Sequence, residues 1–217
     1  MKYQTILFDL DGTLTDSQEG ITRCVQYALA HFGIEVEDLS TLRKFIGPPL
    51  TESFKAFYGM DEHDAHVGLM KYRERFLDVG WAENAVYPGV EALVQKLRGA
   101  GKRLLLATSK PEAQARRIME HFGLAPYFEH ICGPGPNDPD HYGKAEVIRD
   151  ALARAGITGA AGVIMVGDRR HDVEGAHKMG LPCIGVLYGY GSREELEKSG
   201  AEFVAEDMAA LEKHLMA

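Results

Sequence analysis

Acidic and hydroxyl side chains follow three apolar runs of this sequence. The first pair is Asp9 and Asp11, the second is Thr108 and Ser109, and the third is Asp168 and Asp172. Short apolar runs of this kind predict buried strands. Ligands of open parallel sheets bind beyond the carboxyl ends of the strands, so these side chains are expected to converge on one site.

The four aspartates predict a site for a divalent cation. Asp9 and Asp11 are two positions apart, so they point to the same side if strand geometry continues through them. With Asp168 and Asp172 beside them, four carboxylates would crowd one pocket and repel one another. A cation with oxygen ligands relieves this repulsion, and Mg²⁺ is the hard cation that pairs with phosphate. Gly12 lets the backbone turn sharply and approach a ligand closely.

A hydroxyl group and an ammonium group complete a set for phosphoryl transfer. Thr108 supplies the hydroxyl, and Lys144 supplies a cation at the start of an expected helix. With the acids they provide a nucleophile, an acid/base group, a metal site, a hydrogen-bond donor to the phosphate and a cation that neutralises charge. Two structural alternatives stay open: Thr108 as the cap of a helix near Pro111, and Asp172 as a first-turn acid favoured by the helix dipole. Lys110 is expected to be exposed.

Strands and helices alternate along most of the chain. Buried strands are expected at residues 3–10, 103–107, 162–167, 182–187 and 202–205. Amphipathic helices are expected at residues 89–100, 111–122, 144–155 and 169–179. This alternation, with strands that are apolar throughout, is typical of an α/β fold with a Rossmann-like parallel sheet covered by helices on both faces.

One segment contains helical patterns without a convincing strand. It predicts helices at residues 17–32, 39–45, 50–58 and 61–79, with Asp16 or Ser17 as the first N-cap. The sequence Gly47-Pro48-Pro49 interrupts them as a loop or sharp turn. We therefore expect an all-helical cap domain at residues 15–84, inserted into an α/β core domain formed by residues 1–14 and 85–217.

These motifs resemble those of a known superfamily. The sequence Asp9-Leu-Asp-Gly-Thr13 is similar to the opening motif of the haloacid-dehalogenase-like (HAD) hydrolases. Thr108, Lys144 and Gly167-Asp168-xxx-Asp172 match the second, third and fourth motifs in order and spacing. The resemblance covers the whole chain, including a helical cap inserted after the first motif.

The resemblance implies a magnesium-dependent phosphate monoester hydrolase that passes through an aspartyl-phosphate. Asp9 would attack phosphorus and bind the metal. Asp11 would protonate the leaving group, activate water and contact the metal through its backbone carbonyl. Thr108 would donate a hydrogen bond to the phosphoryl group, and Lys144 would neutralise Asp9 and the phosphoryl oxygens. The dehalogenase and phosphonatase branches lack an acid at the position of Asp11, so its presence favours phosphate esters, whose alkoxide departure benefits from a general acid.

The remaining roles concern the metal and the phosphate. Asp168 would bind Mg²⁺, and Asp172 would support the metal shell or its waters. Backbone N–H groups near Leu10, Asp11 and Ser109 would complete a cradle for the phosphate.

The cap type and layout resemble phosphoglycolate phosphatases and their 5′-nucleotidase-like relatives. Phosphoglycolate-type members usually carry Lys-Pro-x-Pro around the third motif, whereas this chain has Gly143-Lys-Ala-Glu-Val147. That difference, together with the loop at residues 133–143, favours the 5′-nucleotidase-like relatives.

Residues 45–49 form a loop that could select the substrate or only separate two cap helices. Arg43, Gly47 and Pro48 are the candidate substrate contacts in and beside it.

Two other functions fit parts of the pattern. A phosphomutase of the same fold would return phosphate to its substrate rather than to water. A signalling receiver also combines strand-end acids, Thr, Lys and Mg²⁺ around a phosphorylated aspartate, but receivers are shorter and carry no helical lid.

The bulk composition limits the partners. The formal net charge of −8 disfavours nucleic acid, and no apolar run approaches the roughly 20 residues that cross a membrane. The three cysteines, Cys24, Cys132 and Cys183, show neither metal spacing nor a disulfide pattern, as expected of buried thiols in a reducing cytoplasm. We expect a cytoplasmic monomer or homodimer that acts on a small-molecule phosphate ester.

Overall fold

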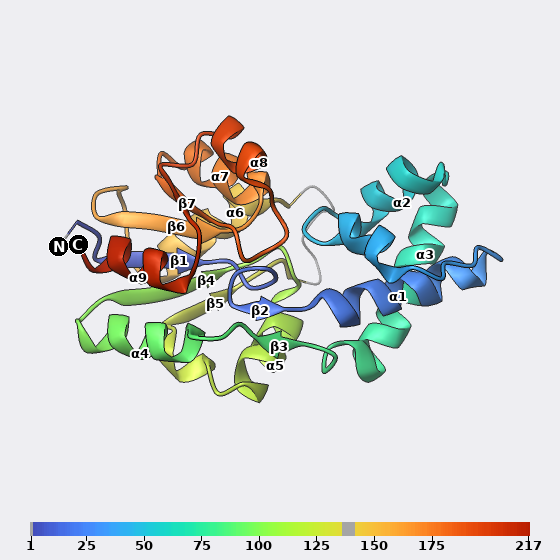
Figure 1. The fold of residues 1–217 in the computed structure, drawn as a ribbon, viewed down its shortest axis with the longest axis horizontal. Helices are drawn as coiled ribbons and strands as arrows, with labels where there is room; N and C mark the ends of the chain where they lie inside the picture. Colours follow the sequence, from blue (N-terminus) through green and yellow to red (C-terminus); the bar gives the residue numbers. More distant parts are fainter. Residues whose placement is uncertain (1, 136–141) are drawn as a thin grey trace. The chain divides into compact units, whose positions relative to one another are not determined.

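Six parallel strands form the central sheet. The computed structural model describes residues 2–135 and 142–217, and its sheet has the order β5-β4-β1-β6-β7-β8 (Figure 1). The strands are β1 (Thr5–Phe8), β4 (Arg103–Ala107), β5 (His130–Cys132), β6 (Val163–Gly167), β7 (Cys183–Val186) and β8 (Phe203–Ala205). Every neighbouring pair is parallel, which confirms the predicted α/β fold with a parallel sheet.

Helices cover both faces of this sheet. All four residues of β1 are buried, which explains why its sequence has no polar face. On one face, α6 (Lys144–Arg154) and α7 (Arg170–Lys178) pack against each other and against the strands. The helices α4 (Val90–Gly99), α5 (Glu112–His121) and α9 (Met208–Met216) lie on the other face (Figure 1).

Several short elements of the sheet domain were absent from the sequence-based prediction. Among them are strand β5, helix α8 (Arg193–Lys198) and helix α9. Strand β5 has three residues and α8 has six, so neither is long enough for its periodicity to stand out. The loop predicted at residues 133–143 lies partly outside the described residues, since 136–141 are not described.

A second compact unit is helical. It contains α1 (Gln18–His31), a 3₁₀ segment (Leu39–Phe45), α2 (Leu50–Tyr58), α3 (Glu62–Arg75) and a π-helical turn (Phe76–Gly80). Helix α3 packs against both α1 and α2. Of the two candidate caps of α1, Asp16 accepts a hydrogen bond from the Gln18 N–H at 3.1 Å, whereas Ser17 makes no capping bond.

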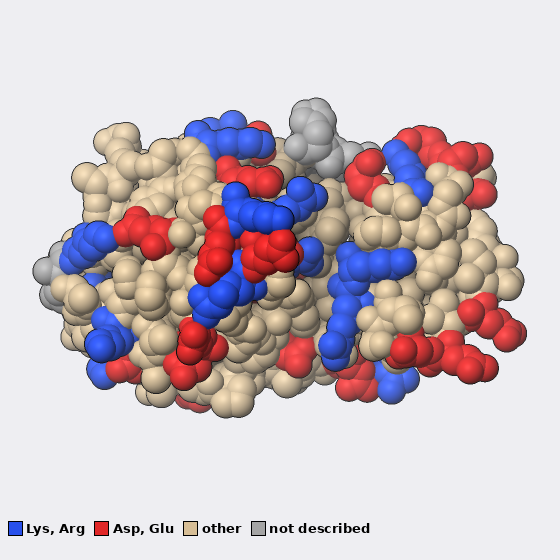
Figure 2. Space-filling model, turned by 45° about the horizontal axis from the view of Figure 1, so that its top comes forward, with Lys and Arg blue, Asp and Glu red and all other residues tan. Residues whose placement is uncertain are grey.

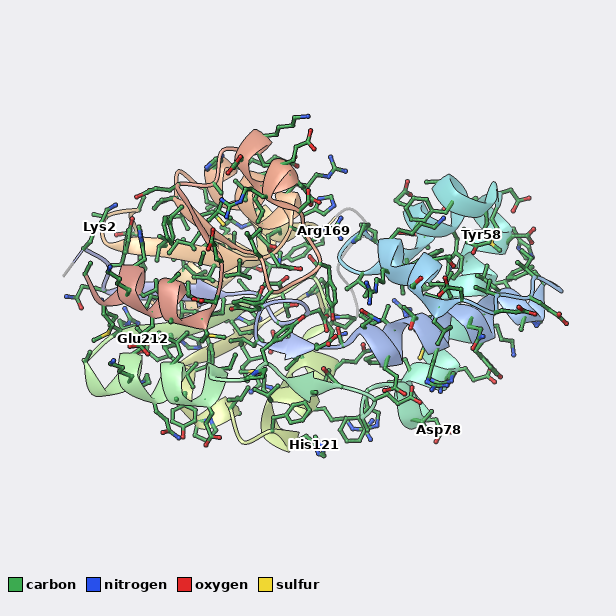
Figure 3. All side chains as sticks on the ribbon, in the orientation of Figure 1. Lys2, Tyr58, Asp78, His121, Arg169 and Glu212 are labelled. Carbon is green, nitrogen blue, oxygen red and sulfur yellow. The ribbon has the colours of Figure 1, made fainter. Side chains whose placement is uncertain are left out.

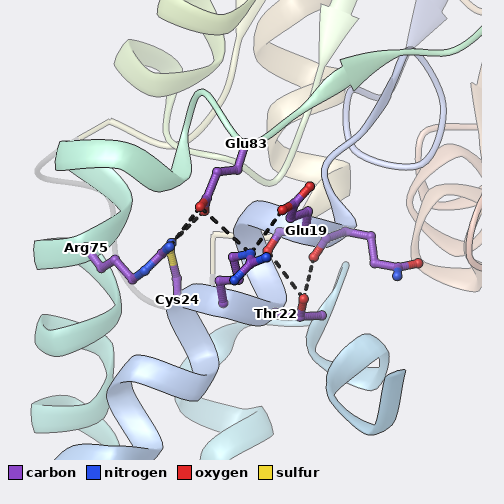
Figure 4. Close-up of polar contacts among 7 residues, drawn as sticks. Glu19, Thr22, Cys24, Arg75 and Glu83 are labelled. Atoms are coloured by element: carbon purple, nitrogen blue, oxygen red, sulfur yellow. Dashed lines mark hydrogen bonds and ion pairs between the residues drawn. The ribbon is translucent and has the colours of Figure 1, made fainter. Parts of the chain in front are cut away.

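Close packing and one ion pair hold the C-terminal part of this helical unit. A Cβ at Gly20 would lie 2.2 Å from the Gly80 carbonyl oxygen, so only glycine fits where α1 meets the π-helical turn. Arg75 forms a two-pronged pair with Glu83, with N–O distances of 2.6 and 2.8 Å, and Arg75 Nη1 also lies 3.4 Å from Cys24 Sγ (Figure 4). This geometry ties α3 to the segment that leaves the unit.

The chain divides into residues 1–15 with 86–217, and residues 16–85. Strand β2 (Thr15–Asp16) pairs with β3 (Ala85–Val86), so both boundaries fall inside a two-stranded ribbon. Strand β2 could not be predicted, because two residues cannot display an alternating pattern.

The surface and the thiols show nothing unusual. Acidic and basic side chains are interspersed on the face in Figure 2. Within the described residues, no helix is long and apolar enough to span a membrane. All three cysteines are buried, as expected.

Candidate active site

The predicted motifs meet at the carboxyl edge of the sheet. Asp9 directly follows β1, Thr108 directly follows β4 and Asp168 directly follows β6. Because β1 lies between β4 and β6, the three strand ends are neighbours. Lys144 begins α6, and Asp172 lies in the first turn of α7.

Three buried aspartates form a cluster that fits a cation. One carboxylate oxygen from each of Asp9, Asp168 and Asp172 lies within 4.8 Å of the others. In each residue one carboxylate oxygen, Oδ1, is buried without a well-aligned hydrogen bond. Hard oxygen donors that converge without hydrogen-bond partners are suited to Mg²⁺. The residues present therefore fit the metal that the sequence predicted.

Lys144 is the cation of this cluster. Its Nζ lies 2.8 Å from both Asp9 Oδ1 and Asp172 Oδ1 and donates a hydrogen bond to the Ala107 carbonyl at 3.1 Å. The two carboxylate contacts are close ion pairs, although their angles are poor for hydrogen bonding. Burial opposes the charged ammonium, but Asp172 and Asp9 outweigh it and raise the pKa of Lys144.

The buried acids resist ionisation. Burial raises the pKa of Asp9 to about 6, with Lys144 working against the rise and Asp172 and Asp11 adding to it. Burial, together with the charges of Asp172 and Asp9, raises the pKa of Asp168 well above its usual range. A divalent cation at this site would favour the ionised form of both, so its binding would be coupled to proton release.

Tight backbone packing orients Asp168. The Tyr190 N–H donates a hydrogen bond of 2.7 Å to Asp168 Oδ2. A Cβ at Gly12 would lie 2.2 Å from that same oxygen, and one at Gly189 would lie 2.4 Å from Asp168 Cβ. Sequence analysis did not single out residues 189–191 as part of the site, because their glycines show that a close approach is possible but not which group approaches.

Asp172 lies in the first turn of α7 and also faces the acid cluster. Its Oδ2 accepts a hydrogen bond of 3.0 Å from the Arg169 N–H, as a first-turn acid does, while its Oδ1 faces Lys144 and the acid cluster. Arg169 is held in turn by Glu195, with Nε 2.9 Å from Oε1; Figure 3 labels Arg169.

Strand geometry does not continue through Asp9 and Asp11. Strand β1 ends at Phe8, and the chain then turns so that the N–H groups of Thr13, Leu14 and Thr15 all point to the Leu10 carbonyl. The strand geometry assumed for the pair is therefore wrong, and the Asp11 carboxylate is not among the three clustered acids.

Lys110 is the partner of Asp11. Its Nζ lies 3.0 Å from Asp11 Oδ2, and its side chain is 6% exposed. The expectation that Lys110 is exposed is wrong. The sequence showed only a lysine near a helix start, and nothing in it indicated a carboxylate 99 residues away as the partner.

Thr108 and its neighbours line the same edge. Thr108 is buried, and its Oγ1 accepts a hydrogen bond of 3.2 Å from the Lys110 N–H. It does not cap the helix, whose N-cap is Pro111 without a side-chain bond. Leu10 is buried and Ser109 exposed.

The proposed cap contacts belong to the helical unit. Arg43 and Gly47 are exposed, and Pro48 is half-buried. The loop is anchored by Phe45, which is buried and packs edge-on against Phe54 and Phe57.

Comparison with known proteins agrees with this architecture. The family described as haloacid dehalogenase-like hydrolase matches residues 6–186. A protein of Pseudomonas aeruginosa named 5′-nucleotidase is 46% identical, over 99% of this chain and 96% of its own length. The tyrosine-protein kinase PtkA of Mycobacterium tuberculosis is 39% identical, over 93% of this chain and 68% of its own. A crystal structure of a predicted phosphatase from Clostridium acetobutylicum superposes with a TM-score of 0.94 at 47% identity, over 100% of this chain and 99% of that one.

The chain belongs to the haloacid dehalogenase-like hydrolase family. The family is one of hydrolases, and similar proteins are named 5′-nucleotidase and predicted phosphatase, so the chain is an enzyme. The predicted resemblance and the enzyme prediction are confirmed.

Proposed function

We propose that this protein is a Mg²⁺-dependent phosphatase of small phosphate monoesters that forms an aspartyl-phosphate on Asp9. The observation that carries the proposal is the buried cluster of Asp9, Asp168 and Asp172 around Lys144, with Asp11 held beside it. The Lys144 ammonium favours an ionised Asp9, which is the form that can attack phosphorus.

The reaction has two steps. Asp9 attacks phosphorus, the ester P–O bond breaks with its electron pair on the leaving oxygen, and Asp11 gives that oxygen a proton. Water then attacks phosphorus while Asp11 takes its proton, and the bond from phosphorus to Asp9 breaks. Lys144, the Thr108 hydroxyl and the backbone N–H groups of Leu10 and Ser109 would hold the phosphoryl oxygens as charge spreads over them.

The metal would be held by Asp9, Asp168 and Asp172, with the Asp11 carbonyl as a further ligand. When bound, Mg²⁺ supplies positive charge that offsets the negative charge of the phosphoryl group in the transition state. The charge balance supports this: Asp9, Asp11, Asp168 and Asp172 exceed Lys110 and Lys144 by two negative charges.

We propose nucleoside 5′-monophosphates as the preferred substrates. The 46% identical relative is named 5′-nucleotidase, and this chain lacks the Lys-Pro-x-Pro pattern of phosphoglycolate-type members. In this proposal the helical unit, residues 16–85, acts as the cap, and Arg43, Gly47 and Pro48 contact the part of the substrate beyond the phosphate.

The test is phosphate release from a panel of monoesters with Mg²⁺ or with EDTA. The panel contains nucleoside 5′-monophosphates, 2-phosphoglycolate, sugar phosphates and p-nitrophenyl phosphate. We expect Mg²⁺-dependent release, highest for a nucleoside monophosphate. Release that is equal in EDTA would contradict the metal assignment, and a preference for 2-phosphoglycolate would contradict the substrate class.

Two outcomes would indicate that the phosphoryl group is transferred to an acceptor other than water. Sugar-phosphate isomerisation without phosphate release would indicate a phosphomutase. The relative named as a tyrosine-protein kinase makes transfer of phosphate from ATP to a protein tyrosine a further reaction to measure. In the proposal, water is the acceptor, and Asp11 would act as its base.

A further inference from the structure

The pair formed by Lys110 and Asp11 separates the acid/base carboxylate from the other acids. Asp11 is near enough to Asp9 to contribute to its raised pKa, yet the Asp11 carboxylate is not a member of the clustered acids. Its Oδ2 is 3.0 Å from Lys110 Nζ instead. Lys110 and Lys144 are thus divided between the acids, since Lys144 pairs with Asp9 and Asp172.

The two oxygens of Asp11 are in different environments. Oδ2 faces Lys110, whereas Oδ1 is buried without a hydrogen-bond partner among the described residues. The Asp11 side chain is 13% exposed and that of Lys110 is 6% exposed, so neither is a freely mobile surface group. A carboxyl group held by one oxygen presents the other in a fixed direction.

Lys110 is itself held in place. It lies between Thr108, whose hydroxyl accepts the Lys110 N–H, and Pro111, which caps α5. The turn after β4 therefore fixes the start of the lysine side chain, and β4 is the immediate neighbour of β1, from which Asp11 comes.

We propose that Lys110 is a positioning residue that holds the acid/base carboxyl of Asp11 with Oδ1 directed at the leaving-group oxygen; this inference rests on the phosphatase function proposed above. An ammonium N–H can donate to Oδ2 whether Oδ1 carries a proton or not. The same contact therefore persists while Oδ1 gives its proton to the ester oxygen as the P–O bond breaks. It also persists when Oδ1 takes a proton from the attacking water.

The proposed role of Lys110 predicts that the activity lost on its replacement depends on the leaving group of the ester. A poor leaving group, such as an alkoxide, needs the proton from Asp11, whereas p-nitrophenolate departs without it. A residue that orients Asp11 should matter for the first kind of ester and little for the second. A residue that only supports the fold, or only binds phosphate, should affect both kinds equally.

The experiment measures kcat/KM of the wild type and of Lys110→Met for a series of aryl and alkyl phosphates with Mg²⁺. This parameter reports the step in which the leaving group departs. We expect a loss of about 10- to 100-fold for alkyl esters and of less than about threefold for p-nitrophenyl phosphate. Each ratio is taken against the wild type with the same ester, so partial unfolding of the variant lowers all ratios together. A uniform loss across the series would overturn the proposal.

Two further variants sharpen the result. Lys110→Arg keeps the cation and should recover at least part of the alkyl-ester activity. Asp11→Asn with Lys110→Met should lose no more activity than Asp11→Asn alone, because Lys110 acts only through Asp11. Additive losses in the double variant would contradict the inference.

The design separates this inference from the proposed function. If the wild type releases no phosphate from any ester in the series, the phosphatase proposal fails. If the wild type is active and the leaving-group dependence of Lys110→Met equals that of the wild type, only the role of Lys110 fails.

Discussion

The two compact units differ in the charged side chains that they bury. Among the described residues, the buried charged side chains all belong to the sheet domain; they are Asp9, Lys102, Lys110, Lys144, Asp168 and Asp172. The buried polar residues of the helical unit are only the hydroxyl residues Ser17, Thr22 and Ser53. The exposed large apolar side chains show the reverse distribution, since Tyr27, Phe57, Met70, Leu77 and Val79 all lie in the helical unit.

This difference indicates a division of labour. Burying a charge costs folding free energy unless the charge is paired. Several charged side chains buried together at one sheet edge therefore indicate a functional site. Lys102 is the exception, because its Nζ donates to the Tyr3 carbonyl at 2.6 Å, away from the acids. The helical unit has no buried charges in the part of the chain that the structure describes, so we expect it to influence substrate selectivity rather than the chemical step. The comparison predicts that substitutions in the sheet domain change the chemistry and that those in the helical unit change substrate preference.

The largest expected effect is that of Asp9→Asn. Removing the nucleophile should lower kcat about 10⁴-fold or more. Because the pKa of Asp9 is raised, its ionised carboxylate costs folding free energy above about pH 6, so Asn should leave the melting temperature at pH 7.5 unchanged or higher. Activity and thermal unfolding are measured together, with the exposed Asp78→Asn of the helical unit as the control. Comparable losses in both variants would contradict the division of labour.

The next effect concerns the metal and pH. Asp9 and Asp168 have raised pKa values, so at low pH a cation must displace protons to bind them. We expect the affinity for Mg²⁺ to be flat at high pH and to fall as the pH drops, by about tenfold per pH unit for each acid that becomes protonated, with Asp9 contributing below about pH 6. Calorimetry and the Mg²⁺-induced rise in melting temperature report this without any assay of activity. An affinity that does not change between pH 5 and 8, or that survives in Asp168→Asn, would argue against this metal site.

The smallest effect is expected in the helical unit. Arg43→Ala and Pro48→Ala should change the ratio of kcat/KM between two natural monoesters by roughly three- to tenfold, with little change for p-nitrophenyl phosphate. Neither residue belongs to the packed core, whereas Phe45 beside them does, so folding should be unaffected. Arg73→Ala, an exposed arginine of α3, is the matched control. If the selectivity ratios stay constant across the panel, the loop only separates helices.

Much of the sheet domain could be predicted because its signals are local. The strands at β1, β4, β6 and β7 are buried on both faces, so each reads as a short apolar run. The order of the motifs along the chain then identified the family. Strand β5 and helix α8 were missed because short elements carry too few residues for a periodic pattern.

The sequence by itself determined the fold class, the family and the acids that gather at the sheet edge. Only the tertiary structure decided which of those acids form the buried cluster and which one pairs with Lys110. The chain turns after Phe8, and the Asp11 carboxylate lies outside the cluster of Asp9, Asp168 and Asp172. The adjacency of β1 and β4 brings Lys110 to Asp11. The clustered acids and their pairing with Lys144 join residues more than a hundred positions apart. Charge pairing inside a protein depends on distances of a few ångströms and on burial, and neither is a property of local sequence.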